Sequence, residues 1–188
     1  MKLKAIMIEN RNIPLLPIVD RHMKFLPIGT EVEVITTLPI VNMHDYNKAL
    51  TDPRFWAEYT NYDRVLIFQH DSGLLREGIE EFFEWDYIGA RWSFPPYVGN
   101  GGLSLRNPKL MANICIDHPY KGMAIHGNED VYFTNIMTNS NEYGRIATQE
   151  AAERFSVETM YKLGSMGYHA IHKYLSPLQC NNILNQYK

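Results

Sequence analysis

An aspartate that directly follows the most apolar segment of the chain is the first candidate for chemistry. Residues 64–68 read Arg-Val-Leu-Ile-Phe, and Gln69 and His70 separate them from Asp71. A carboxylate at the end of a buried strand can hold a hard divalent cation together with substrate phosphates. An aspartate before Ser-Gly also serves as a turn residue that accepts local backbone hydrogen bonds. On an extended strand His70 would point away from Asp71, which favours a structural role for this histidine.

A glycine cluster and an acidic pair are the next candidates. Residues 99–102 read Gly-Asn-Gly-Gly, and glycine lets a backbone approach a ligand closely, although a tight turn before a strand needs the same residues. Glu129 and Asp130 open a predicted helix, where the helix dipole favours ionised carboxylates. An ionised carboxylate in a cleft is also what a general base requires. Sequence position does not separate capping from base catalysis.

The late histidines, the glycine spacing and the cysteines form no known functional motif by themselves. His169 and His172 lie three residues apart without an acidic neighbour, a spacing more typical of packed histidines than of metal ligands. The glycine cluster lacks the spacing of a dinucleotide-binding loop or a P-loop. Cys115 and Cys180 are far apart and outside any CxxC spacing, so they are expected to be reduced thiols.

The elements that must position these residues alternate along the chain. Apolar and β-branched runs predict strands at 4–8, 32–35, 64–68 and 103–105, and helices are predicted within 13–26, over 53–59, from 128 and from about 148. This alternation predicts a sheet with substantial parallel pairing. Ligands of such sheets bind beyond the carboxyl ends of the strands. Polar residues 9–11 and 69–72 and the glycine cluster are therefore expected to meet there.

Length and composition limit the class of protein. The 188 residues predict a single domain over 1–188, and 45% hydrophobic with 21% charged residues exclude a disordered, collagen-like or coiled-coil chain. The net charge of -3, without a basic stripe, argues against nucleic acid as a partner. No apolar run approaches the roughly 20 residues of a transmembrane helix, and none resembles a signal peptide. A cytoplasmic location is expected, in the host cytoplasm if the chain is viral.

The order of these motifs resembles the glycosyltransferase-A (GT-A) superfamily. Within it the chain is similar to a small family of sugar-transferase-like domains of bacteria, fungi and large viruses, including a virus-encoded glycosyltransferase domain of similar size. The elements that carry the resemblance, within about residues 3–175, are HDS (70–72), DYIGA (86–90), GNGGLSLR (99–106) and EDVYF (129–133). The resemblance implies a single α/β GT-A-like domain with a mixed, mostly parallel sheet flanked by helices.

The same resemblance implies a metal-dependent inverting glycosyltransferase. Its donor would be a nucleotide sugar, expected to be UDP-linked, and its acceptor a hydroxyl of a glycan or another molecule. Asp71 matches the last acid of the DxD motif, which holds Mn²⁺ or Mg²⁺ against the donor diphosphate, and Gln69 stands in place of the first acid. His169 matches a late histidine on the same ion, and a mixed oxygen and imidazole site favours Mn²⁺. Asp130 matches the base of inverting members, with Glu129 as second candidate.

Other positions would contact the donor. Glu9, Asn10 and Arg11 match the loop that meets the nucleotide, Gly101 and Gly102 match the segment facing the transferred sugar, and Gln69, His70 and Asn100 are grouped with these donor-binding residues. Two other functions stay open. Gln69 in place of an acid, together with the short chain, favours a catalytically silent nucleotide- or sugar-binding module. A nucleotidyltransferase would need paired carboxylates for its metals, and the sequence offers one convincing acid.

Overall fold

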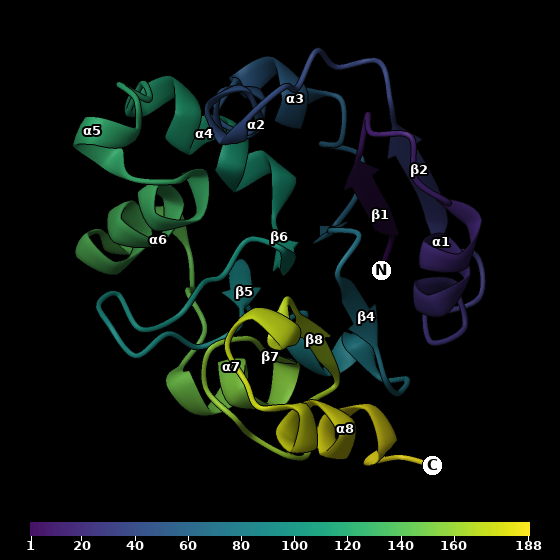
Figure 1. Cartoon of the computed structure of the whole chain (residues 1–188). Coiled ribbons are helices and arrows are strands. Elements are labelled where there is room, and N and C mark those ends of the chain that lie inside the picture. Colours follow the sequence, from purple (N-terminus) through teal and green to yellow (C-terminus); the bar gives the residue numbers. More distant parts are fainter.

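The computed structural model describes residues 1–188 and contains a central five-stranded sheet with the order β2-β1-β3-β6-β5 (Figure 1). Its strands are β1 (Leu3–Ile8), β2 (Glu31–Ile35), β3 (Arg64–Phe68), β5 (Tyr87–Gly89) and β6 (Leu103–Arg106). β1 pairs in parallel with β2 and β3, whereas β6 is antiparallel to both β3 and β5. Four strands therefore share one direction and β6 opposes them. The predicted α/β fold with a mixed, mostly parallel sheet is confirmed.

Helices cover both faces of this sheet, as the alternation of buried side chains along β1 requires. Ala5 and Met7 belong to one core cluster, and Ile6 between them belongs to another. On the Ala5 face lie α1 (Leu16–Met23), α7 (Gln149–Phe155) and the 3-10 helix Ile79–Phe82. On the Ile6 face lie α2 (Met43–Leu50), α3 (Pro53–Ala57), α4 (Pro108–Asp117) and α6 (Glu129–Asn139). The result is a three-layer α/β/α arrangement.

A second sheet of three very short strands joins the end of β3 to the C-terminal segment (Figure 1). It consists of β4 (Ser72–Leu74), β8 (Gly167–His169) and β7 (Ser156–Val157), and α8 (Pro177–Asn185) packs against it through Ile183. Ser72 pairs with His169, and the Ala170 N–H donates to the Asp71 carbonyl at 3.0 Å. This register brings the late histidine beside the aspartate that follows β3.

Three further features of the fold are a short helix, the state of the two cysteines and the character of the helices. α5 (Met123–His126) is a single turn before α6. Cys115 and Cys180 are free thiols, in agreement with the sequence. No helix combines the length and the apolar character that crossing a lipid bilayer would need.

Candidate active site

A cleft of about 320 Å³ opens at the carboxyl ends of β1 and β3, where the sequence predicted a ligand site. It is lined by residues from the ends of both strands and from the start of α2, namely Ile8, Glu9, Asn10, Arg11, Ile40, Val41, Asn42, Met43, Tyr46, Gln69, His70 and Lys173. A larger hollow of about 700 Å³ lies at the amino end of β1, and none of the predicted site residues line it. Five of the predicted site residues line the smaller cleft, namely Glu9, Asn10, Arg11, Gln69 and His70, whereas Asp71, His169, Asp130 and the glycine cluster are not part of its lining.

The loop after β1 forms one wall of the cleft through a local ion pair. The buried Glu9 carboxylate accepts hydrogen bonds from Arg11 Nε at 2.7 Å and from the Arg11 backbone N–H at 3.0 Å. Hydrogen bonding to Arg11 lowers the pKa of Glu9. Arg11 Nη2 also lies 2.8 Å from His70 Nδ1, and the Asn10 side-chain amide donates to the Ile40 carbonyl. These contacts tie the loops after β1 and β3 together.

The chain turns immediately after β3, and this corrects the expectation for His70. The Ser72 N–H donates to the Gln69 carbonyl at 3.1 Å, so His70 and Asp71 stand in a turn rather than on an extended strand. His70 Nδ1 lies 3.8 Å from Asp71 Oδ1. The prediction that the two side chains point apart is wrong, because strand alternation ends at Phe68.

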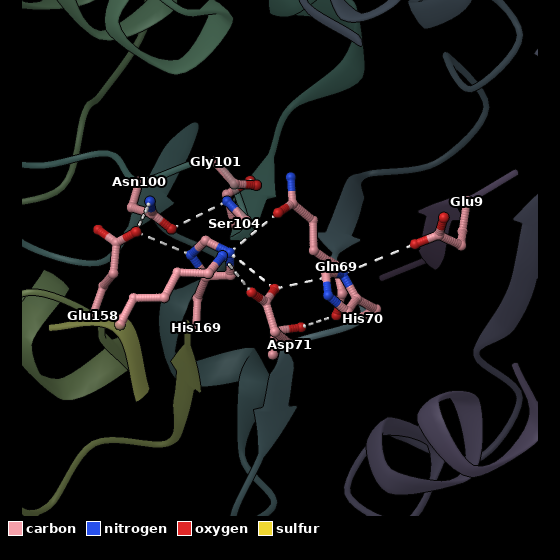
Figure 2. Close-up of polar contacts among 12 residues, drawn as sticks. Glu9, Gln69, His70, Asp71, Asn100, Gly101, Ser104, Glu158 and His169 are labelled. Carbon is pink, nitrogen blue, oxygen red and sulfur yellow. Dashed lines mark hydrogen bonds and ion pairs between the residues drawn. The ribbon is translucent and has the colours of Figure 1, made fainter. Parts of the chain in front are cut away.

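A buried polar cluster surrounds His169 (Figure 2). Its Nδ1 donates to Glu158 Oε1 at 3.1 Å, and Asn100 Nδ2 donates to the same oxygen at 2.7 Å. Because an ionised glutamate only accepts, this contact fixes the hydrogen of the neutral ring on Nδ1. Nε2 then faces two more oxygens, Gln69 Oε1 at 3.1 Å and Asp71 Oδ1 at 3.3 Å.

Three electron-pair donors therefore converge on one point. Asp71 Oδ1 is buried and has no hydrogen-bond partner, so this oxygen would be satisfied by a protonated His169 or by a cation. Adjacent ligands of an octahedral ion with bonds of about 2.1 Å are about 3 Å apart, close to the observed spacings. No group of three or more His, Cys, Asp or Glu side chains is arranged to hold a metal ion, so the third donor would be the Gln69 amide. Such ions often use few protein ligands and add substrate phosphates. The residues fit a divalent cation.

Charges around Asp71 keep it ionised. Burial opposes ionisation, but contacts with His169 and Lys173 outweigh it and lower the pKa of Asp71 well below its usual value. Lys173 Nζ lies 2.8 Å from Asp71 Oδ2 and lines the cleft. Burial likewise disfavours the charged ring of His169, yet Asp71 and Glu158 raise its pKa. Positive charge is therefore favoured at this point, whether it is a proton or a cation.

The acidic pair at the start of α6 divides into two different environments. Glu129 is buried and forms a two-pronged ion pair with Arg106, from Nη1 at 2.6 Å and from Nη2 at 3.0 Å. Arg106 is fully buried on β6, and its guanidinium lies 4.8 Å from the Tyr87 ring. Both oxygens of Glu129 are thus held by a structural partner. Asn47 on α2 accepts the Glu129 backbone N–H at 3.0 Å and fixes the start of the helix.

Asp130 is the partly exposed member of the pair. Its Oδ2 accepts the Gly101 N–H at 3.0 Å and its Oδ1 accepts the Val131 N–H at 2.8 Å. Burial, together with the negative charge of Glu129, raises the pKa of Asp130 to about 7, against the smaller effect of the two backbone hydrogen bonds. Each oxygen keeps a second lone pair for another donor. A carboxyl group of this kind can exchange a proton near neutral pH.

The glycine segment connects the surroundings of Asp130 with those of His169. A Cβ on Gly102 would stand 2.2 Å from His169 Nε2, and one on Gly101 would stand 2.4 Å from Glu129 Oε1. Both glycines therefore make room for side chains of the protein itself. Because the two residues are adjacent, they bring Asp130 and His169 to neighbouring positions of one strand end. Contact of Gly101 and Gly102 with a sugar stays a prediction.

The structure also adds three residues that the sequence did not single out: Glu158, Lys173 and Tyr46. Glu158 and Lys173 reach the site through the second sheet and the turn after β8, and Tyr46 reaches it from α2. No local motif marks any of them. His172 is exposed and takes no part in the cluster.

A protein-family model matches most of this chain. Residues 29–169, about three-quarters of the chain, match the family model described as "Protein of unknown function (DUF5672)". The chain belongs to the DUF5672 family. No curated protein matches the DUF5672 chain.

Solved structures show the fold of this DUF5672 chain. A glycosyltransferase involved in the glycosylation of the major capsid of PBCV-1 matches with a TM-score of 0.63 and 9% identity, over 99% of this chain and 100% of that one. The A197 protein of STIV matches with a TM-score of 0.47 and 13% identity, over 73% of this chain and 78% of that one. The first match shows that this chain shares the fold of that glycosyltransferase. At this identity it shows the fold alone.

Proposed function

We propose that this DUF5672 chain is a glycosyltransferase that moves a sugar from a nucleotide diphosphate donor to a hydroxyl acceptor. The observation that carries the proposal is the convergence of Asp71, His169 and Gln69 beside a cleft, with one carboxylate oxygen left without a partner. The fold shared with the PBCV-1 glycosyltransferase supports it. A UDP-linked sugar as the donor remains part of the proposal.

The leaving group would be bound in the cleft beside Lys173, next to Asp71 and His169. Arg11 and Lys173 line the cleft as cations and would bind the oxygens of a diphosphate. Asp71, His169 and Gln69 would hold the divalent cation, with Mn²⁺ preferred because the donor set mixes oxygen and imidazole. When bound, this cation supplies Lewis-acid charge that stabilises the departing diphosphate. Glu158 would keep the His169 ring oriented through its Nδ1 contact.

The acceptor would be activated at the Asp130 end. Asp130 would accept the proton of the acceptor hydroxyl while that oxygen attacks the anomeric carbon, which inverts the configuration in one displacement. Base catalysis of this kind contributes about 10²–10⁴-fold. The pKa of Asp130 near 7 and its free lone pairs support this role. Glu129 does not compete for it, because Arg106 engages both of its oxygens.

One observation favours a second candidate, a binding module without turnover. Lys173 already neutralises Asp71, and position 69 offers an amide where the superfamily has an acid. A site of this kind could bind the anionic nucleotide without a metal ion. The two functions differ in whether Mn²⁺ strengthens binding and whether sugar is transferred.

Calorimetry with a panel of nucleotide sugars, with and without Mn²⁺, tests the proposal on the wild type, Asp71→Ala and Asp20→Ala. Asp20 is an exposed aspartate on α1 and provides the matched control. We expect Mn²⁺-dependent binding in the wild type and in Asp20→Ala, and its loss in Asp71→Ala. Equal affinities for all three proteins would refute the metal assignment. Tight binding without transfer to any acceptor would favour the binding module.

A further inference from the structure

Tyr46 is a buried tyrosine that lines the cleft. It lies one turn into α2, and its ring packs in the core cluster that contains Ile6 and Ile67. The residue is only 9% exposed, yet it lines the same cleft as Gln69. The side chain thus packs in the core and also forms part of the wall of the cleft.

The Tyr46 hydroxyl has no hydrogen-bond partner in the folded chain, although it is buried. Other buried tyrosines satisfy theirs: Tyr87 donates to the Gly99 carbonyl at 2.8 Å, and Tyr132 donates to the His118 carbonyl at 2.6 Å. Buried polar groups without a partner are rare and call for an explanation. A ligand in the cleft would supply the missing partner.

The surroundings of Tyr46 indicate which part of a ligand it meets. Gln69, beside the candidate cation site, lines the same cleft as Tyr46. On the other side, Asn47, the residue after Tyr46, accepts the Glu129 backbone N–H at 3.0 Å at the start of the helix that carries Asp130. Burial raises the pKa of Tyr46 above its usual value, so the phenol stays protonated and can donate. Tyr46 therefore lies between the candidate cation site and the candidate base.

We propose that Tyr46 is a sugar-binding residue whose hydroxyl hydrogen-bonds an oxygen of the sugar being transferred. The inference rests on the proposed function and deepens it, since the sugar is the part of the donor that lies between the diphosphate and the attacking hydroxyl. The nucleotide and the diphosphate would not need this contact. Loss of the Tyr46 hydroxyl should therefore weaken binding of the sugar and leave binding of the nucleotide unchanged.

The test uses Tyr46→Phe, which keeps the ring and removes only the hydroxyl, with Tyr132→Phe as the matched control. Binding of UDP and of a panel of UDP-sugars is measured by calorimetry with Mn²⁺, and thermal unfolding is followed without ligand. We expect Tyr46→Phe to bind UDP as the wild type does and the preferred UDP-sugar about tenfold more weakly. Its unfolding temperature should be unchanged or higher, because a buried donor without a partner is removed.

The control variant, Tyr132→Phe, should lose stability and keep its affinity for the sugar. Tyr132→Phe loses a hydrogen bond inside the protein, so it should unfold at a lower temperature and bind both ligands normally. Equal affinity of Tyr46→Phe and the wild type for the UDP-sugar would overturn the role of Tyr46 and leave the proposed function standing. A drop in the unfolding temperature like that of Tyr132→Phe would show a structural partner for the hydroxyl and would also overturn it. A wild type that binds neither UDP nor any UDP-sugar would overturn both proposals.

Discussion

Replacement of Asp130 by asparagine should change how the stability of the protein depends on pH. The carboxyl group has a pKa of about 7 in the folded chain against 3.8 for an ordinary aspartate, chiefly because burial and then Glu129 disfavour its charged form. In the window between these values the folded state binds more protons at this site than the unfolded state. The stabilisation is complete below pH 3.8 and is lost as the pH rises through about 7. Asparagine cannot titrate and should remove this dependence.

The size of the effect follows from the shift. About three pKa units at 1.4 kcal/mol each give an upper bound of about 4 kcal/mol over the whole window. Because Asp130 is partly exposed, solvent screening reduces this to about 2 kcal/mol. More than half of that should fall between about pH 5 and about pH 8. The variant should therefore gain at least about 1 kcal/mol relative to the wild type across that interval.

Denaturant unfolding of both proteins at the two pH values measures this difference directly. The exposed Asp20→Asn variant is the control and should follow the wild type at both. Parallel pH dependence of the wild type and Asp130→Asn would refute the assigned environment of Asp130.

Activity gives a second readout of Asp130. The wild-type transfer rate should rise with pH through about 7, because the base must be ionised. Asp130→Asn should lower transfer by about 10²–10⁴-fold while leaving nucleotide-sugar binding largely intact. Transfer that survives in the variant would remove Asp130 from the mechanism.

Three further substitutions test the supports of the site. Glu158→Gln should weaken Mn²⁺ binding about 10- to 100-fold in calorimetry, because the ring of His169 loses its carboxylate partner; unchanged affinity would contradict this role. Arg106→Met should lower the free energy of unfolding by about 3–5 kcal/mol, since Glu129 is left buried and unpaired, and a loss below about 1 kcal/mol in a denaturant titration would contradict that. Gly102→Ala should reduce Mn²⁺ affinity in a folded protein, because its Cβ would displace the histidine ring, and full affinity would show that the ring does not bind the ion.

Four of the five strands of the main sheet could be predicted from the sequence because each contains an apolar run or alternating apolar residues, whereas β5, with three residues, shows no such pattern. The prediction for 64–68 matches β3 residue for residue, and the predicted strand at 4–8 differs from β1 only at its first residue. The small sheet could not be found in this way. β7 and β8 have two and three residues, too few to show a periodic pattern. Their pairing, however, is what carries His169 to Asp71.

The candidate site, like the fold, could be predicted only in part. Residues at strand ends, such as Glu9 and Gln69, were placed correctly at the cleft because topology brings the carboxyl ends of parallel strands together. Glu158 and Tyr46 lie far from these motifs in the sequence, and only tertiary packing brings them in. Arg106 ends the GNGGLSLR element, but its ion pair with Glu129 also depends on tertiary packing. This pair gives Glu129 a structural role that a helix-start position alone could not reveal.

A crystal structure with Mn²⁺ and UDP tests the central claim most directly. We expect anomalous density for one ion bound by Asp71, His169 and Gln69, with the diphosphate beside Lys173. A structure in which the nucleotide is bound but His169 contacts no ion, and Lys173 still pairs with Asp71, would contradict the account.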